Sequence, residues 1–222
     1  MSAQPEDPPI GRDNTQQRER RLRTTEFAST ILLALATVLT TWSSYQASLW
    51  SGIQATNYNQ ANATRVEASR ESNVAGQLAG LDIALFMAWI KASDAGDHQQ
   101  EDFYRRRFRP EFRQAFEAWL ATNPHTNPQA AATPFTFAGY TSEHLQRARE
   151  LDDRATALFQ AGHEANHHAD TYVLGTVLLS TVLFFCGILQ QFHDARVRYV
   201  LLGIAACLFV FGLSRIIVLP RA

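Results

Sequence analysis

Residues 172–189 (YVLGTVLLSTVLFFCGIL) and 199–218 (YVLLGIAACLFVFGLSRIIV) decide the fold of this chain. Each stretch is close to the roughly 20 apolar residues that a helix needs to cross a hydrocarbon core of about 30 Å. Neither contains a proline, which would leave backbone groups unpaired in lipid. The sequence therefore predicts a membrane hairpin, with transmembrane helices at 171–190 and 199–218 and a short basic turn at 191–198.

A third apolar run, 27–42 (FASTILLALATVLTTW), begins just after a cluster of arginines. It is short for a membrane helix, but Tyr45, Leu49 and Trp50 extend its apolar face, and aromatic side chains suit the membrane interface. We interpret the run as a signal anchor that forms a transmembrane helix at 26–48. A cleaved signal peptide is the competing interpretation, but the charged leader is long and no small-x-small cleavage pair follows the run.

The distribution of arginine predicts the orientation of these spans. Five arginines precede the first span and two lie in the turn between the second and third spans. They are Arg12, Arg18, Arg20, Arg21 and Arg23, followed by Arg196 and Arg198. Since segments rich in arginine beside a span stay in the cytoplasm, the amino terminus and the turn are predicted to face inward. Residues 49–170 and the carboxyl terminus then lie outside, and Arg215, in the last turn of the third span, can extend its stem to the outer interface.

Average composition hides the membrane segments, because a polar outer domain dilutes them. The chain is 46% hydrophobic and has a formal net charge of −1, as a soluble protein would. The balanced charge predicts no nucleic-acid partner. Lys91 is the only lysine, and this preference for arginine suggests a GC-rich bacterial genome. Cys186 and Cys207 fall inside the second and third spans, where we interpret them as packing residues rather than as a disulfide.

The chain outside the spans divides into a tail and a helical domain. Residues 1–25 contain three prolines and no apolar periodicity, so a disordered cytoplasmic tail is predicted. In the outer domain, 49–170, the alanine-rich residues 51–93 predict a long helix that continues the first span. Residues 123–140 again contain three prolines and predict an extended connector. Thr141 or Ser142 can then cap a last outer helix, which runs without a breaker into the second span.

Aromatic residues recur every three or four positions between residues 101 and 120 and predict a stripe buried in the domain core. The stripe consists of Tyr104, Phe108, Phe112, Phe116 and Trp119 or Leu120. Pro110 predicts a kink or a break there, since it removes a backbone donor. The interleaved arginines could bind lipid headgroups or anions, but their spacing from acidic residues favours a solvated face of ion pairs. The expected pairs are Glu101 with Arg105, Asp102 with Arg106, Arg107 with Glu111 and Arg113 with Glu117.

The strongest resemblance to a catalytic motif is the segment His163-Glu164-Ala165-Asn166-His167, followed by His168 and Asp170. In metalloproteases, two histidines at this spacing bind zinc and the glutamate acts as general base. The match fixes only three positions, and no third protein ligand or cleft is apparent. We therefore predict neither a metal site nor a catalytic residue, and keep His163, His167 and Asp170 as candidates for an adventitious metal site.

Asp82 lies among apolar residues, where an unpaired carboxylate would be costly. Arg147, Arg149 or Arg154 could supply a partner. Alternatively, Asp82 points to solvent from the polar side of its helix, and the sequence favours neither reading.

Several short segments resemble a family of small bacterial membrane proteins that have no assigned activity. The segments are 42–47 with 50–52 (WSSYQA, WSG), 103–104 with 107–113 (FY, RFRPEFR), 118–122 (AWLAT), and 170–174 with 183–185 (DTYVL, LFF). The resemblance covers nearly everything after Phe27. It implies one amino-terminal span, an outer helical domain and a carboxyl-terminal hairpin. Members of that family do not generally carry the two-histidine zinc pattern, so the resemblance implies architecture only.

Together these patterns predict an all-α membrane protein of the bacterial inner membrane, with three transmembrane helices and a helical extracytoplasmic domain. Its expected role is structural or interactive and not enzymatic, without a cofactor. Its expected partners are the lipid bilayer, further copies of itself and another membrane or periplasmic protein. Small residues of the first span would permit close helix packing. They are Ala28, Ser29, Ala34, Ala36 and Thr37. The first alternative is a pore or transport accessory subunit. A pore would need polar residues along several spans, and the second and third spans offer few beyond Thr176, Ser180 and Thr181. The last alternative is a membrane-tethered zinc hydrolase.

Overall fold

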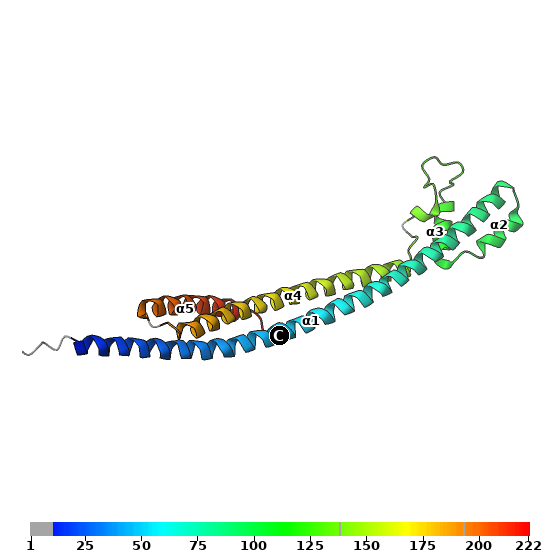
Figure 1. The fold of residues 1–222 in the computed structure, drawn as a ribbon. Helices are drawn as coiled ribbons and strands as arrows, with labels where there is room; N and C mark the ends of the chain where they lie inside the picture. The colour runs from blue at the N-terminus through cyan, green and yellow to red at the C-terminus, as the bar shows by residue number, and fades with distance from the viewer. Residues whose placement is uncertain (1–10, 138, 193) are drawn as a thin grey trace, which may run out of the picture. The chain divides into compact units, whose positions relative to one another are not determined.

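The computed structural model describes residues 11–137, 139–192 and 194–222, and side chains from Arg23 on. Within these ranges the chain is helical and contains no β-strand (Figure 1). The elements are α1 (Gly11–Asp94), α2 (His98–Arg105), α3 (Pro110–Leu120), the 3-10 helix η1 (Pro134–Thr136), α4 (Glu143–Leu189) and α5 (Ala195–Ile217). Three of them, α1, α4 and α5, are long and apolar enough to cross a membrane. The predicted all-α fold class with three spanning helices is confirmed.

The chain forms two compact units. The first, which we call the span unit, comprises Met1–Asn57 and Ala161–Ala222. The second, the head unit, comprises Tyr58–Gln160. Helices α1 and α4 each contribute residues to both units. This confirms two predictions: the first span continues into a long outer helix, and the last outer helix continues into the second span.

The amino-terminal tail differs from the prediction. Helix α1 begins at Gly11, so disorder up to residue 25 is wrong from that residue on. The physical reason is that no proline follows Pro9 until Pro110, and the glutamine, arginine and glutamate residues ahead of the span favour helix. They continue the helix of the apolar span, so no separate nucleation is needed. Residues 1–10 of the predicted tail lie outside the described part of the chain.

In the span unit, α1 presents a seam of small and polar residues at heptad spacing. Ser29, Ala36 and Ser43 recur every seven residues and are at most 1% exposed. Of the small residues expected to allow close packing, Ser29 and Ala36 are buried, whereas Ala34 and Thr37 remain exposed. Buried small side chains let helix backbones approach closely in a membrane.

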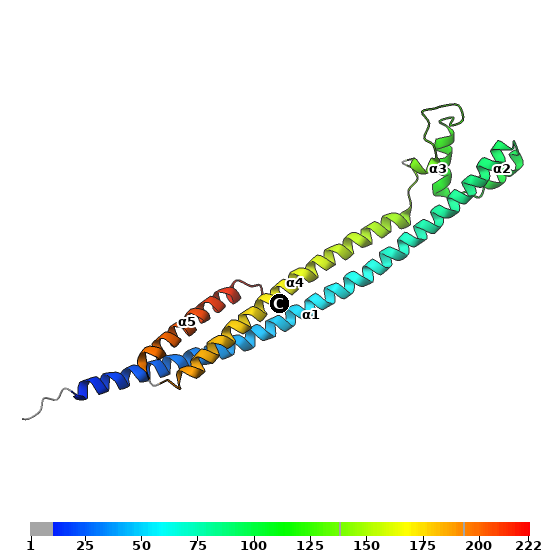
Figure 2. The ribbon, with the colours of Figure 1, turned by 45° about the horizontal axis from the view of Figure 1, so that its top comes forward.

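Helix α5 lies beside α4 in both ribbon views (Figure 2). Gly175 permits this approach, since a Cβ built there would lie 3.0 Å from the Cγ1 atom of Ile216. Both cysteines are free thiols, but only Cys186 is buried as a packing residue, whereas Cys207 is exposed.

The predicted hairpin is present, but its turn is shorter than expected. Helix α4 ends at Leu189 and α5 begins at Ala195, where the Asp194 carboxylate accepts a hydrogen bond from the backbone N–H of Arg196 at 3.0 Å. Because Asp194 caps the helix, Arg196 and Arg198 lie in its first turn and not in the connecting turn. The side chain of Arg198 is 5% exposed and donates to Glu26 of α1 at 3.2 Å.

In the head unit, α1 and α4 pack as antiparallel helices along a seam of alanines. Ala61, Ala68 and Ala75 of α1 recur every seven residues, and Ala148 and Ala155 of α4 have the same spacing; each is at most 7% exposed. Two contacts set the antiparallel register. The rings of Tyr58 and Phe159 stack at 5.2 Å, and His144 Nδ1 lies 2.6 Å from Glu71 Oε2.

The hydroxyl of Ser142 accepts a hydrogen bond from the N–H of Leu145, which confirms the predicted cap of α4.

The core of the head unit is aromatic. It joins side chains of α1, the α2–α3 corner and α3: Phe86, Trp89, Phe108, Phe112, Phe116 and Trp119. The predicted stripe is therefore core, and Pro110 begins α3 after a break, as expected. The connector contributes Phe135 and Tyr140 to the same cluster. Its backbone is held by Trp119, whose indole N–H donates to the carbonyl of Ala131 at 2.6 Å.

The arginines of this region do not form the predicted ion pairs. Among the described residues, Arg105 pairs with Glu117 at 3.5 Å, and Arg109 pairs with Asp82 and Glu111. Arg113 donates to the carbonyls of Arg106 and Phe108. The predicted break between Arg105 and Pro110 removes the i, i+4 relation of Arg107 to Glu111. Arg105 of α2 and Glu117 of α3 pair with each other across the break, and not with their i, i+4 neighbours in their own helices.

Candidate functional site

The most buried charged group of the head unit is the carboxylate of Asp82, on α1, which is 0% exposed. Its two oxygens are bound by Arg109: the Nε atom donates to Oδ1 at 3.1 Å and the Nη2 atom to Oδ2 at 2.6 Å. The hydroxyl of Tyr140 also donates to Oδ2, at 3.0 Å. We call these three residues the Asp82 network. Such bidentate, charge-assisted hydrogen bonds are the strong ones in proteins.

The network joins three segments that are distant in sequence. Asp82 comes from α1 and Arg109 is the residue before α3, while Tyr140 ends the connector. Pro110 positions Arg109, because a residue before proline is held in an extended conformation, here with φ −61° and ψ 151°. Tyr140 is positioned by the aromatic core, since its ring meets Phe112 edge-on at 5.9 Å. The network therefore ties the connector and α3 to α1.

The environment of the network favours the arrangement seen. The hydrogen bond to Asp82 raises the pKa of the Arg109 guanidinium, so this group stays charged. Burial, followed by the hydrogen bond to Asp82, raises the pKa of Tyr140 from 10.0 to about 12, so its hydroxyl stays a donor. Both carboxylate oxygens are thus engaged by groups that do not lose their protons near neutral pH. This arrangement holds structure together, whereas a general base needs a carboxylate that can accept a proton from substrate.

Of the two readings of Asp82 that the sequence left open, burial with a partner is confirmed, but the proposed partners are wrong. The expected partners were Arg147, Arg149 or Arg154. Within the described part of the chain, Arg147 instead lies 4.0 Å from Glu71. The actual partners, Arg109 and Tyr140, were not predicted. The available signal was the Arg109-Pro110 pair, since proline breaks the helix there and separates Arg109 from the regular face of arginines.

The histidine segment lies in the span unit and does not converge on one point. Asn166 donates to Asp170 at 3.0 Å, and His168 packs against Trp50 with ring centroids 4.6 Å apart. No group of three or more histidine, cysteine, aspartate or glutamate side chains is arranged to hold a metal ion in the part of the chain that the structure describes. Within these described residues, His163, His167 and Asp170 thus do not form such a group, and the absence of a metal site stays a prediction.

A second polar cluster in the span unit holds the last residues of the chain. The carbonyl of Pro220 accepts hydrogen bonds from Trp50 Nε1 at 3.3 Å and from the Tyr172 hydroxyl at 3.1 Å. The backbone N–H of Ala222 donates to Gln46 Oε1 at 3.0 Å. Because Gln46 and Trp50 belong to α1 and Tyr172 to α4, this cluster ties the segment after α5 to both helices.

Comparison of the chain with protein-family models, curated proteins and solved structures finds no match. The resemblance described above therefore stays a prediction, and the site is interpreted from its own geometry.

The raised pKa of Tyr140 predicts that the stability of the head unit falls at alkaline pH. A pKa raised in the folded state stabilises the fold fully below the unfolded value of about 10. That contribution is lost as pH rises toward the folded value of about 12. We expect Tyr140 to titrate near pH 12 in an ultraviolet absorbance titration of the folded chain. The Tyr140→Phe variant should lack this phase and lose less stability over the same pH range. An unchanged titration curve in that variant would contradict the assignment.

Proposed function

We propose that this chain is an inner-membrane protein of a bacterium that acts as a structural and interaction module. Three spans anchor it, and its head unit is exposed on the extracytoplasmic side. Three apolar helices support the membrane location, and the arginines that flank them support the orientation, with the amino terminus in the cytoplasm. We propose no catalytic step. The carboxylate of Asp82 is engaged by Arg109 and Tyr140, and the histidine segment is not part of a metal-binding group among the residues that the structure describes.

The observation that carries the interaction role is a second apolar face on α1 in the head unit. Val66, Val74 and Leu81 recur at spacings of eight and seven residues and are 53%, 38% and 49% exposed. Their positions lie well away from the buried alanines of the same helix. A surface helix normally carries one apolar stripe, directed at the core. A second one exposed to solvent is typical of a surface that binds a partner. We propose that it packs against a second copy of this chain or against another membrane or periplasmic protein.

This interaction predicts a specific loss. We expect the chain with both Val74→Glu and Leu81→Glu to lose its partner, because charges on the shared face would be buried without counterions. The mass of the particle purified from native membranes and reconstituted in nanodiscs, measured by light scattering, should fall. Ile83→Glu with Met87→Glu is the matched control, since these residues are also apolar and are 48% and 59% exposed but lie on another side of α1. A mass that is unchanged in the first variant, or lowered equally in both, would contradict the assignment.

The orientation is tested by reporter fusions. A periplasmic reporter such as alkaline phosphatase, fused after Asn127 in the connector, is expected to be active. The same reporter fused near Asp194, in the turn before α5, is expected to be inactive, and a cytoplasmic reporter should give the reverse pattern. The physical reason is the retention of the flanking arginines in the cytoplasm. The opposite pattern for both sites would invert the topology.

A pore or transport accessory subunit is the second candidate. The polar residues of the second span offer it little support, since the hydroxyls of Thr176 and Thr181 donate to the carbonyls of Tyr172 and Val177 within their own helix. Hydroxyls satisfied in this way need no water-filled path beside them.

A further inference from the structure

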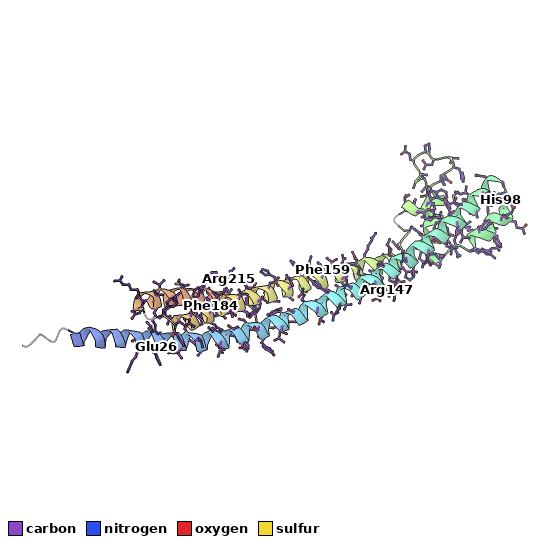
Figure 3. All side chains as sticks on the ribbon, in the orientation of Figure 1. Glu26, His98, Arg147, Phe159, Phe184 and Arg215 are labelled. Carbon is purple, nitrogen blue, oxygen red and sulfur yellow. The ribbon has the colours of Figure 1, made fainter. Side chains whose placement is uncertain are left out.

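The span unit contains a groove between the end of α5 and the start of the apolar part of α4. It has a volume of about 500 Å³ and is lined by His167, Thr171, Ser214, Arg215, Val218 and Leu219. Arg215, labelled in Figure 3, lies in the last turn of α5 and is exposed. The groove thus combines a cation, hydroxyl groups and apolar side chains at the end of a predicted span.

The cation of this groove is free of acidic partners. No ion pair involves Arg215 among the described residues, whereas Arg198, at the other end of the same helix, is buried against Glu26. The nearby hydroxyls do not occupy the guanidinium either, since Thr171 donates to the carbonyl of His167 and Ser214 to that of Phe211. The donors of Arg215 are therefore available, and guanidinium groups match the geometry of phosphate oxygens.

Farther from the chain's last residues along α4 and α5, the helix faces that carry the groove's polar residues become apolar. Leu174 lies seven residues after His167 on α4, and Phe211 lies four residues before Arg215 on α5, so each shares the face of its polar neighbour. Leu174 is 46% and Phe211 54% exposed. A ligand that fills the groove can thus place an anionic group beside Arg215 and extend an apolar chain along Leu174 and Phe211.

We propose that this groove binds the phosphodiester headgroup of an anionic phospholipid, with Arg215 as the principal anion-binding residue. The inference rests on the membrane location proposed above. The positive charge of Arg215 favours an anionic headgroup. The apolar side chains of Leu174 and Phe211 beside it favour a lipid over a free phosphate ion. Basic pockets between membrane helices bind anionic headgroups in this way.

The test is native mass spectrometry of the full chain, titrated with phosphatidylglycerol or with the zwitterionic phosphatidylcholine. We expect the wild-type chain to bind phosphatidylglycerol preferentially and the Arg215→Gln variant to bind it at least about tenfold more weakly, the loss expected for a charge-assisted hydrogen bond. Arg221→Gln is the matched control, because it removes the same charge after the same helix but does not line the groove. It should bind as the wild type does. Inorganic phosphate should not displace the lipid at equal concentration.

Three results would overturn the assignment: no preference for the anionic lipid, unaltered binding by Arg215→Gln, or an equal loss in both variants. Displacement by equimolar phosphate would identify a free anion as the ligand and overturn the lipid. Membrane extraction separates this failure from that of the proposed function. A chain that leaves the membrane without detergent contradicts both, whereas an integral protein without lipid preference contradicts the groove alone.

Discussion

Replacement of Arg109 by Met is expected to lower the free energy of unfolding of the head unit by about 3 to 5 kcal/mol, the usual cost of removing one partner of a buried ion pair. The carboxylate of Asp82, 0% exposed, would keep only the hydrogen bond from Tyr140. Thermal or denaturant unfolding of the full chain in detergent measures this loss, followed by the fluorescence of Trp89 and Trp119, which belong to the core of the head unit.

Two further variants separate the ion pair from a general effect of losing an arginine. Arg106→Met removes an exposed arginine next to the same corner and should change the stability by less than about 0.5 kcal/mol. Combining Arg109→Met with Asp82→Leu removes both charges, and it should recover much of the loss, because apolar replacement of a whole buried pair is often neutral. If Arg109→Met alone is as stable as the wild type, the Asp82 network does not stabilise the head unit.

Replacement of Phe112 by Ala is the second large effect that we expect, again about 3 to 5 kcal/mol. Phe112 is 0% exposed and meets rings from α1 and from the connector: Phe86 edge-on at 6.1 Å and Phe135 stacked at 5.0 Å. Its loss would leave a cavity where three segments of the chain meet. The same unfolding measurement applies. Phe103→Ala is the control, because Phe103 is 43% exposed and should cost far less. Equal stability of Phe112→Ala and the wild type would mean that the aromatic stripe faces solvent.

The two replacements test different kinds of contact in one small unit. Phe112 contributes through burial of apolar area and close packing, which are nearly independent of pH and salt. Arg109 contributes through charge, and its partner Asp82 is fully buried, so salt should screen the pair less than it screens an exposed one. If the groove at Arg215 binds lipid as proposed, the span unit adds a third kind of contact, in which the partner of the arginine is supplied by the membrane.

Features that depend on consecutive residues followed from the sequence. The three apolar helices, the hairpin of α4 and α5, the cap at Ser142 and the break at Pro110 are each set by hydropathy or backbone chemistry within a few turns. The aromatic stripe was also predictable, because its spacing of three and four residues marks one face of a helix, and large aromatic side chains on one face are buried together.

Features that depend on which segments meet in space did not follow from the sequence. Asp82 is 27 residues from Arg109 and 58 from Tyr140, and no periodicity connects residues so far apart. Arg105 of α2 pairs with Glu117 of α3, a contact between two helices that i, i+4 spacing within one helix cannot anticipate. The hydrogen bonds of Gln46, Trp50 and Tyr172 to Pro220 and Ala222 likewise join the segment after α5 to α1 and α4. Hydropathy and periodicity describe each helix alone, whereas the pairing of polar side chains is chosen when the helices pack, since each buried polar group must find a partner among those that packing brings near.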